Sequence, residues 1–364
     1  MQYNGLVADT QRPISKALES WDYGTIENGV KKIDTMLHFG CFTLGYNQKQ
    51  LVQNVCNVVS NIKPEIAETL VPTDPLYLNQ VAFDLNQKLY NMTGYNSFYC
   101  LSGSDANEGA VKLASAYQYS IGNKHKKHIV ALKDSYHGST FMSSNIGYRN
   151  LMVDPFYTID KHKGVIHVDR QFDLDDVNWN KVAAFFVETC SYGQNMKPYS
   201  EEFWNKLRTI QEKYDVLIVV DDIFFGGGKT GSWLGFEHLP VQPDIFTQGK
   251  AITSGFFPLA ITYYTDKIKN NLPDNFRWDH SFTYSFSIAG IVSVLETLKI
   301  LEQNNYMETV PAIHQRAKEL LYNKRVKTIN SFGNIFMLKK QYQFMLILPF
   351  NPTEEYWQAL ENTL

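Results

Sequence analysis

Apolar residues follow two alternating spacings through the middle of the chain. Short continuous apolar runs, typical of buried strands, occur at 98–101, 129–132, 182–187, 216–220 and 245–247. Between some of these runs, apolar residues recur every three or four positions, which predicts helices over 105–119 and 203–214. Strands that alternate with helices predict an α/β fold with a mostly parallel sheet and helices on both of its faces.

The pattern changes toward both ends. Repeated glycines between residues 21 and 46 predict short strands and turns, and helices are expected over 48–59 and 75–90. Helices are also predicted over 288–301 and 310–322, before short apolar runs at 334–338 and 344–348 and a last helix from 353. We therefore predict a large domain over 47–287 and a small α+β domain formed by 1–46 and 288–364.

Composition excludes several classes of protein. Apolar residues make up 44% of the chain, charged residues 20%, and the net charge is -3, which is typical of a globular protein and favours neither nucleic acid nor an acidic membrane surface as a partner. No apolar run approaches the ~18 residues of a membrane span, and the first residues do not resemble a signal peptide. The four cysteines form no CxxC pair, so we expect neither a zinc site nor disulfides. Reduced thiols are typical of the cytoplasm, and we therefore expect a cytoplasmic protein.

Candidate chemistry lies where the predicted strands end. Gly103 and Ser104 open the helix after the first run, where free N–H groups and the helix dipole attract an anion such as a phosphate. An ordinary capped helix is the alternative, since Asp105 and Glu108 have the spacing of a capping box.

Three further side chains follow the next two predicted strands. Tyr136 and His137 come after the run at 129–132, and an aromatic ring there can stack on a flat ligand or belong to the core. Glu188 comes directly after the run at 182–187. It could be a carboxylate that supports the site, or it could only cap the end of the strand.

A pair of acids and a lysine follow the two central strands. Asp221 and Asp222 could hold magnesium, be structural, or bind a protonated heterocycle. The GGGKT that follows is no P-loop, because Ile223 stands where the first glycine belongs. Lys250 comes just after the strand at 245–247, and a lysine in a dry site can form a Schiff base with an aldehyde. A carboxylate and an amine at neighbouring strand ends predict a cofactor held between them.

Six motifs, in this order, resemble those of the class III aminotransferases, which are pyridoxal-phosphate enzymes of fold type I. They read SGSDANEGAVKLA, YHGST, VETCSYGQN, VVDDIFFGGGKTG, DIFTQGKA and HSFTYS. The resemblance runs from about residue 22 to residue 301. It implies the fold type I sheet, with a small domain that looks shortened at its C-terminal end.

The resemblance also implies roles for individual residues. Lys250 would form the Schiff base with pyridoxal 5′-phosphate, and Asp221 would pair with the pyridine nitrogen. Ile223 and Tyr136 would sandwich the ring. The remaining cofactor-binding positions are Gly103 and Ser104 at the phosphate, with Thr283 from the neighbouring subunit of a homodimer, and His137 and Glu188 from the other motifs.

The implied reaction passes an amino group from a small amine or amino acid to a keto-acid or aldehyde acceptor. An aminomutase or racemase of the same fold and a degenerate, non-catalytic member stay open as alternatives. The motifs also differ from the usual family pattern. Asp222 replaces a glutamate, Lys229 an arginine, and Phe224 and Phe225 stand where polar residues are common. No arginine follows Arg325, where many members have one for a substrate carboxylate, so the substrate is left open.

Overall fold

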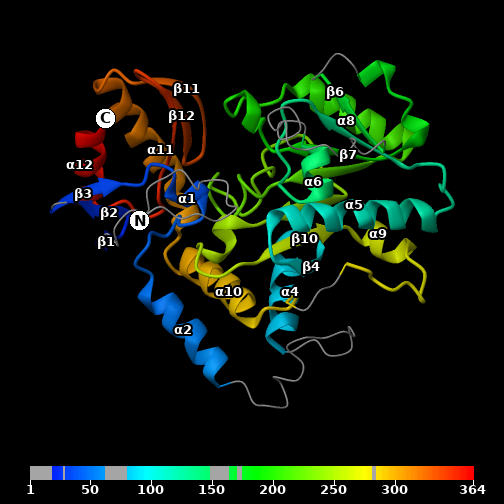
Figure 1. The fold of residues 1–364 in the computed structure, drawn as a ribbon, viewed down its shortest axis with the longest axis horizontal. Helices are drawn as coiled ribbons and strands as arrows, with labels where there is room; N and C mark the ends of the chain where they lie inside the picture. The colour runs from blue at the N-terminus through cyan, green and yellow to red at the C-terminus, as the bar shows by residue number, and fades with distance from the viewer. Residues whose placement is uncertain (1–18, 28, 62–79, 148–163, 170–173, 281–283) are drawn as a thin grey trace, which may run out of the picture.

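A seven-stranded sheet lies at the centre of the computed structural model, which describes residues 19–27, 29–61, 80–147, 164–169, 174–280 and 284–364 (Figure 1). Its strand order is β4-β10-β9-β8-β7-β5-β6. The strands are β4 (Asn96–Cys100), β5 (His128–Leu132), β6 (Val165–Val168), β7 (Val182–Glu188), β8 (Leu217–Asp221), β9 (Ile245–Gln248) and β10 (Ala260–Tyr264). β10 runs antiparallel to β4 and β9, and the other pairs are parallel, so the sheet is mostly parallel as predicted.

Helices cover both faces of this sheet because successive residues of a strand point to opposite sides. Phe185 and Val187 of β7 pack in one apolar cluster with residues of α4, α8 and α10. Ala184 and Phe186 pack in another with residues of α5, α6 and α9. The helix bounds are α4 (Gln80–Thr93), α5 (Gly103–Ser120), α6 (Phe141–Ile146), α8 (Glu201–Tyr214), α9 (Asp266–Asn271) and α10 (Ile288–Gln303).

Two small antiparallel sheets, each of three strands, come from the two ends of the chain and lie to the left in Figure 1. One contains β1 (Glu19–Trp21), β2 (Gly24–Glu27) and β3 (Val30–Ile33), and the other β11 (Lys327–Phe332), β12 (Ile335–Lys339) and β13 (Gln343–Ile347). Trp21 and Tyr23 share an apolar cluster with Phe336 and Trp357, so the two ends of the chain pack together. This packing agrees with the proposed small domain, whose boundaries stay a prediction.

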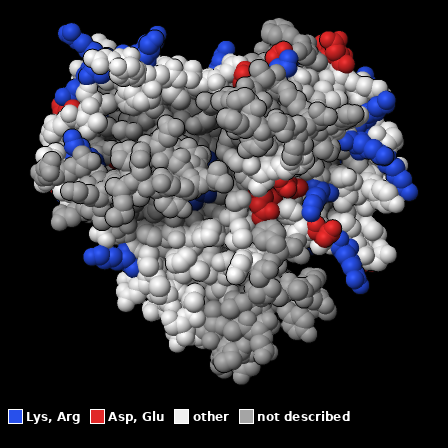
Figure 2. All heavy atoms as spheres, in the orientation of Figure 1, with Lys and Arg blue, Asp and Glu red and all other residues white. Residues whose placement is uncertain are grey.

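The other α-helices among the described residues are α1 (Leu37–Gly40), α2 (Lys49–Ser60), α11 (Tyr306–Asn323) and α12 (Glu354–Thr363). α1 lies between the small sheets and the seven-stranded sheet in Figure 1. Of the described helices, none is long and apolar enough to cross a membrane. On the face shown in Figure 2, acidic and basic side chains are scattered among uncharged ones.

Candidate active site

The carboxyl ends of the parallel strands bring the predicted site residues to one edge of the sheet. Glu188 and Asp221 are paired neighbours at the ends of β7 and β8, and Thr247 of β9 lies beside Asp221. A cavity of about 590 Å³ opens at this edge. It is lined by eight of the predicted residues: Gly103, Ser104, Tyr136, His137, Glu188, Asp221, Ile223 and Lys250. Thr283, the ninth, lies outside the described residues.

Asp221 is held by three hydrogen bonds. Its Oδ2 accepts from Nδ1 of His137 at 2.9 Å and from Nδ2 of Asn107 at 2.8 Å. Its Oδ1 accepts from the backbone N–H of Ile223 at 3.1 Å. The carboxylate is only 6% exposed, so these donors replace the water it would otherwise bind and fix its orientation.

Asn107 and Thr247 are parts of this network that the sequence interpretation missed. Oδ1 of Asn107 accepts a hydrogen bond from the Thr247 hydroxyl at 2.8 Å, while Nδ2 also reaches the carbonyl of His137 at 2.8 Å. Asn107 is fully buried on the inward face of α5, one turn after Ser104. A polar side chain amid the small apolar residues of that face was the signal that could have identified it, because buried amides need partners.

Lys250 begins a short 3-10 turn, Lys250–Thr253, directly after β9. Its backbone has φ 53°, a left-handed conformation that is uncommon outside glycine. Nζ lies 4.8 Å from the centre of the Phe224 ring. Burial lowers the pKa of Lys250 below 10.5, although Asp221 and Glu188 oppose the shift. The side chain therefore lies in a partly buried, acid-lined setting in which a lysine can become a nucleophile.

Glu188 faces the cavity with one oxygen that lacks a partner. The side chain is 5% exposed, and Oε2 has no hydrogen bond among the described residues. Burial raises the pKa of Glu188 well above 4.5, and the nearby Asp221 charge adds to the shift. Backbone hydrogen bonds from Tyr192 and Tyr136 oppose it only in part. Burial therefore favours the protonated form of the Glu188 carboxyl.

The N-terminus of α5 forms a cradle with two glycines. A Cβ on Gly103 would lie 2.6 Å from Cδ1 of Ile223, and a Cβ on Gly138, at φ 122°, would lie 2.4 Å from the Ser104 hydroxyl. That hydroxyl accepts a hydrogen bond from the backbone N–H of Ser139 at 3.0 Å. Because neither glycine has a Cβ, the cradle leaves room for an anion beside the N–H groups of Gly103 and Ser104.

The expected capping box is not formed. Ser102 caps α5 by accepting the N–H of Asp105 at 3.2 Å, and Glu108 instead accepts the N–H of Met142 at 3.0 Å. The reason is that the helix begins two residues earlier than the pattern indicated, at Gly103.

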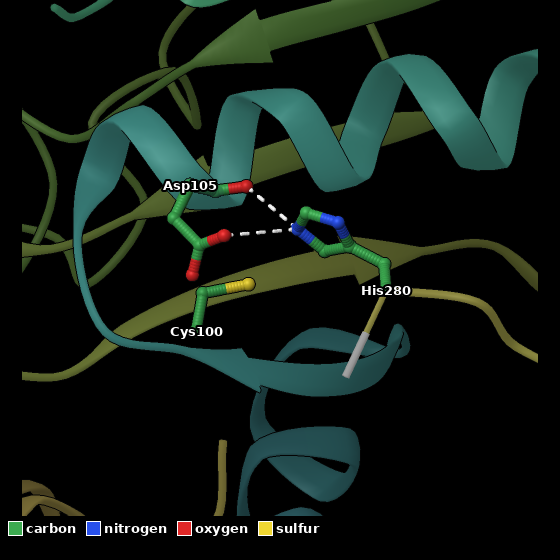
Figure 3. A group of neighbouring side chains, drawn as sticks. All are labelled: Cys100, Asp105 and His280. Atoms are coloured by element: carbon green, nitrogen blue, oxygen red, sulfur yellow. Dashed lines mark hydrogen bonds and ion pairs between the residues drawn. The ribbon is translucent and has the colours of Figure 1, made fainter. Parts of the chain in front are cut away.

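A contact between Asp105 and His280 ties the chain at His280 to the start of α5 (Figure 3). Nε2 of His280 lies 3.1 Å from Oδ1 and 3.0 Å from the carbonyl of Asp105. Oδ2 of Asp105 accepts the N–H of Leu101 at 3.1 Å. Cys100 lies beside this pair. The atoms of Cys100, Asp105 and His280 that could bind a metal ion lie within 4.8 Å of one another.

This arrangement of strand-end acid, lysine and anion cradle agrees with the comparisons. The family model for the aminotransferase class III proteins matches residues 8–343. The chain belongs to the class III aminotransferases. Among curated relatives, vanillin aminotransferase of Capsicum chinense is 28% identical over 328 residues, covering 80% of this chain and 69% of the relative. Putrescine–pyruvate aminotransferase of Pseudomonas aeruginosa is 25% identical and covers 93% and 78%.

Solved structures agree on the fold. A transaminase from the marine bacterium Virgibacillus superimposes with a TM-score of 0.86 at 18% identity, covering all of this chain and 94% of that one. The predicted family and the fold type I class are therefore confirmed. This class III aminotransferase transfers amino groups with pyridoxal 5′-phosphate as its cofactor.

The described residues fit this cofactor. The glycine cradle at α5 suits a phosphate, and the unpartnered buried polar atoms, Oε2 of Glu188 and Nε2 of His137, suit a polar ring held between strand ends. Asp221 and Lys250 supply an acid and an amine in the same cavity.

Proposed function

We propose that Lys250 is the lysine that carries pyridoxal phosphate covalently through its side-chain amine, and that Asp221 binds the pyridine nitrogen. The observation that supports this assignment is that both side chains line one cavity with the α5 cradle. Gly103 and Ser104 bind the phosphate, and Ile223 and Tyr136 lie against the two faces of the ring.

When bound, pyridoxal phosphate receives the amino group and supplies an electron sink for the loss of the substrate's α-proton. Asp221, fixed by His137 and Asn107, keeps the ring nitrogen protonated. Lys250 moves the proton, because its lowered pKa leaves a larger share of neutral amine near pH 7. Burial raises the pKa of Glu188 well above 4.5 and so favours the protonated form of this carboxyl at the wall.

The donor is a small amine or amino acid, and the acceptor is a keto acid or an aldehyde. The names of the relatives, which include vanillin and putrescine–pyruvate aminotransferases, support this range. We also propose a homodimer in which Thr283 of each subunit reaches the neighbouring active site, on the strength of the HSFTYS motif. The cytoplasm is the proposed location, since all four cysteines are free thiols.

The test of Lys250 is to fix the cofactor in place with borohydride and to locate the modified lysine by peptide mass. The expected result is modification of Lys250 alone and its loss in Lys250→Ala. The matched competitor is Lys229, which is fully buried and close enough to interact electrostatically with Lys250. Modification of Lys229 in the wild type would refute the assignment. Transfer of nitrogen to an added keto acid separates an aminotransferase from a mutase or racemase.

A further inference from the structure

A row of aromatic rings forms one wall of the cavity. The ring centres of Tyr136 and Tyr192 are 6.3 Å apart, those of Tyr192 and Phe224 5.4 Å, and those of Phe224 and Phe225 5.2 Å. All four side chains line the cavity, together with Phe39 of α1. Aromatic walls offer a large apolar contact area at low cost in side-chain entropy, so they favour an apolar, ring-sized group.

The charged residues that line the described part of the cavity leave no lysine or arginine to pair with a substrate carboxylate. Among the described residues that line the cavity, Lys250 is the sole lysine or arginine, and Glu188 and Asp221 are the acids. The proposed function assigns Lys250 and Asp221 to the cofactor. A substrate carboxylate would therefore meet aromatic rings and Glu188, with no lysine or arginine of the described part of this chain left to pair with it. Burying a carboxylate without a counter-charge is strongly unfavourable.

The buried carboxyl of Glu188 also bears on which donors the cavity accepts. Its Oε2 is buried and has no hydrogen-bond partner among the described residues. Burial raises the pKa of Glu188 well above 4.5, which favours the protonated form of this carboxyl and weakens its attraction for a second ammonium group of a diamine. The wall thus offers aromatic rings and one buried carboxyl.

We propose that the amino donor of this aminotransferase is a monoamine with an apolar, ring-sized tail and no carboxylate. Tyr192 and Phe224 select the tail by contact, and no lysine or arginine among the described cavity residues is left to pair with a donor carboxylate. The inference rests on the proposed function, since it takes Lys250 and Asp221 as occupied by the cofactor.

The decisive comparison uses two donors that differ by one group. 2-Phenylethylamine and L-phenylalanine share the ring and the amine, and only the second has a carboxylate. The holoenzyme is mixed with each donor, and the rate at which the visible absorption of the bound cofactor is lost gives a second-order rate constant. We expect 2-phenylethylamine to react about 100-fold faster, the scale set by one unpaired buried charge.

Two results would overturn the inference: phenylalanine reacting as fast as 2-phenylethylamine, or the diamine 1,4-diaminobutane reacting faster than 2-phenylethylamine. Absence of any loss of absorption with every donor would instead overturn the proposed function. The two failures are therefore distinguishable.

A charge added to the wall tests the cause of the selectivity. Tyr192→Arg places a cation in the aromatic row, and Tyr192→Gln removes the ring without adding charge. We expect only the arginine variant to shift the preference toward phenylalanine, by about 10-fold or more, while both variants keep the visible absorption of bound cofactor. An equal shift in both variants would overturn the role of charge.

Discussion

Nδ1 of His137 and Nδ2 of Asn107 both bond the same oxygen of Asp221, at 2.9 and 2.8 Å. His137 comes from the loop after β5, Asn107 from α5 and Asp221 from the end of β8, so the contact joins three elements that are far apart in the chain. Thr247 of β9 fixes Asn107 in turn. The carboxylate that we assign to the pyridine nitrogen is therefore oriented by the sheet and by the helix that forms the phosphate cradle.

Asn107→Ala tests this orientation. It removes one donor to Asp221 and leaves the Thr247 hydroxyl without its partner, a loss of about 1–3 kcal/mol for a buried group. We expect kcat to fall by about 10- to 100-fold, with the cofactor still attached. Thr247→Val is the matched control, because it disturbs Asn107 but leaves all three bonds to Asp221, and it should lower kcat less. Equal effects would show that the helix packing matters and not the orientation of Asp221.

Gly138→Ala tests the phosphate cradle. A Cβ here would lie 2.4 Å from the Ser104 hydroxyl, and φ 122° is itself strained for alanine. We expect the affinity for pyridoxal phosphate to fall by about 10-fold or more, as measured by titration of the apoenzyme. The control is Gly122→Ala, which has φ 89° and nothing within 4 Å. It should be strained and lower stability, yet leave cofactor affinity unchanged, and a matching loss of affinity would argue against the cradle.

Lys229→Met tests a buried charge pair behind the cavity. Lys229 and Asp222 are fully buried, and burial shifts the pKa of each toward the other, to about 7 in both cases. Nζ of Lys229 also donates to the carbonyl of Gly226 at 2.6 Å. We expect the variant to lose about 1–3 kcal/mol of stability at pH 7, because the buried Gly226 carbonyl loses its donor and Asp222 loses a nearby positive charge.

The pH dependence of that loss has a definite sign. Because the folded pKa of Lys229 is lowered to about 7, the unfolded wild type binds more protons above pH 7, and its stability rises there with pH. The variant lacks this gain, and without the cation Asp222 ionises less readily. The deficit should therefore grow between pH 7 and 9, by up to about 1.4 kcal/mol per pH unit for each proton. Urea unfolding of the wild type and of Lys229→Met at pH 7 and pH 9 measures this deficit in the free energy of unfolding. Lys318→Met, at an exposed position of α11, is the control. A deficit that does not change with pH would contradict the prediction.

Strand and helix positions were largely predictable because buried strands and amphipathic helices leave regular apolar spacing. The α5 helix and strands β7 and β8 were found in this way. β10 was not expected, although it completes the sheet, because its pairing with β4 and β9 joins residues that are distant in the sequence. β6 was missed for the same reason, whereas β11, which pairs with the next strand β12, was missed because its sequence KTINSF is mostly polar.

The candidate site was predictable where residues follow a strand, as Asp221 and Lys250 do. Asn107 and His280 were not singled out, because their importance comes from contacts that a linear spacing does not contain. The same holds for the aromatic row, whose four rings come from three separate segments. Phe224 stood out in the sequence only as an unusual apolar residue.

The last prediction concerns His280, whose imidazole binds Asp105 at the first turn of α5 (Figure 3). His280 precedes the segment that contains Thr283, the residue we propose to reach the phosphate in the neighbouring subunit. His280→Asn should weaken the contact with Asp105 and lower the affinity for pyridoxal phosphate by about 10-fold. The weaker affinity for pyridoxal, which lacks the phosphate, should change little. His125→Asn, at an exposed position, is the control. A chelator should leave the affinity unchanged, because we interpret this group as a hydrogen-bonded contact. Loss of cofactor on chelation would instead make Cys100, Asp105 and His280 a metal site.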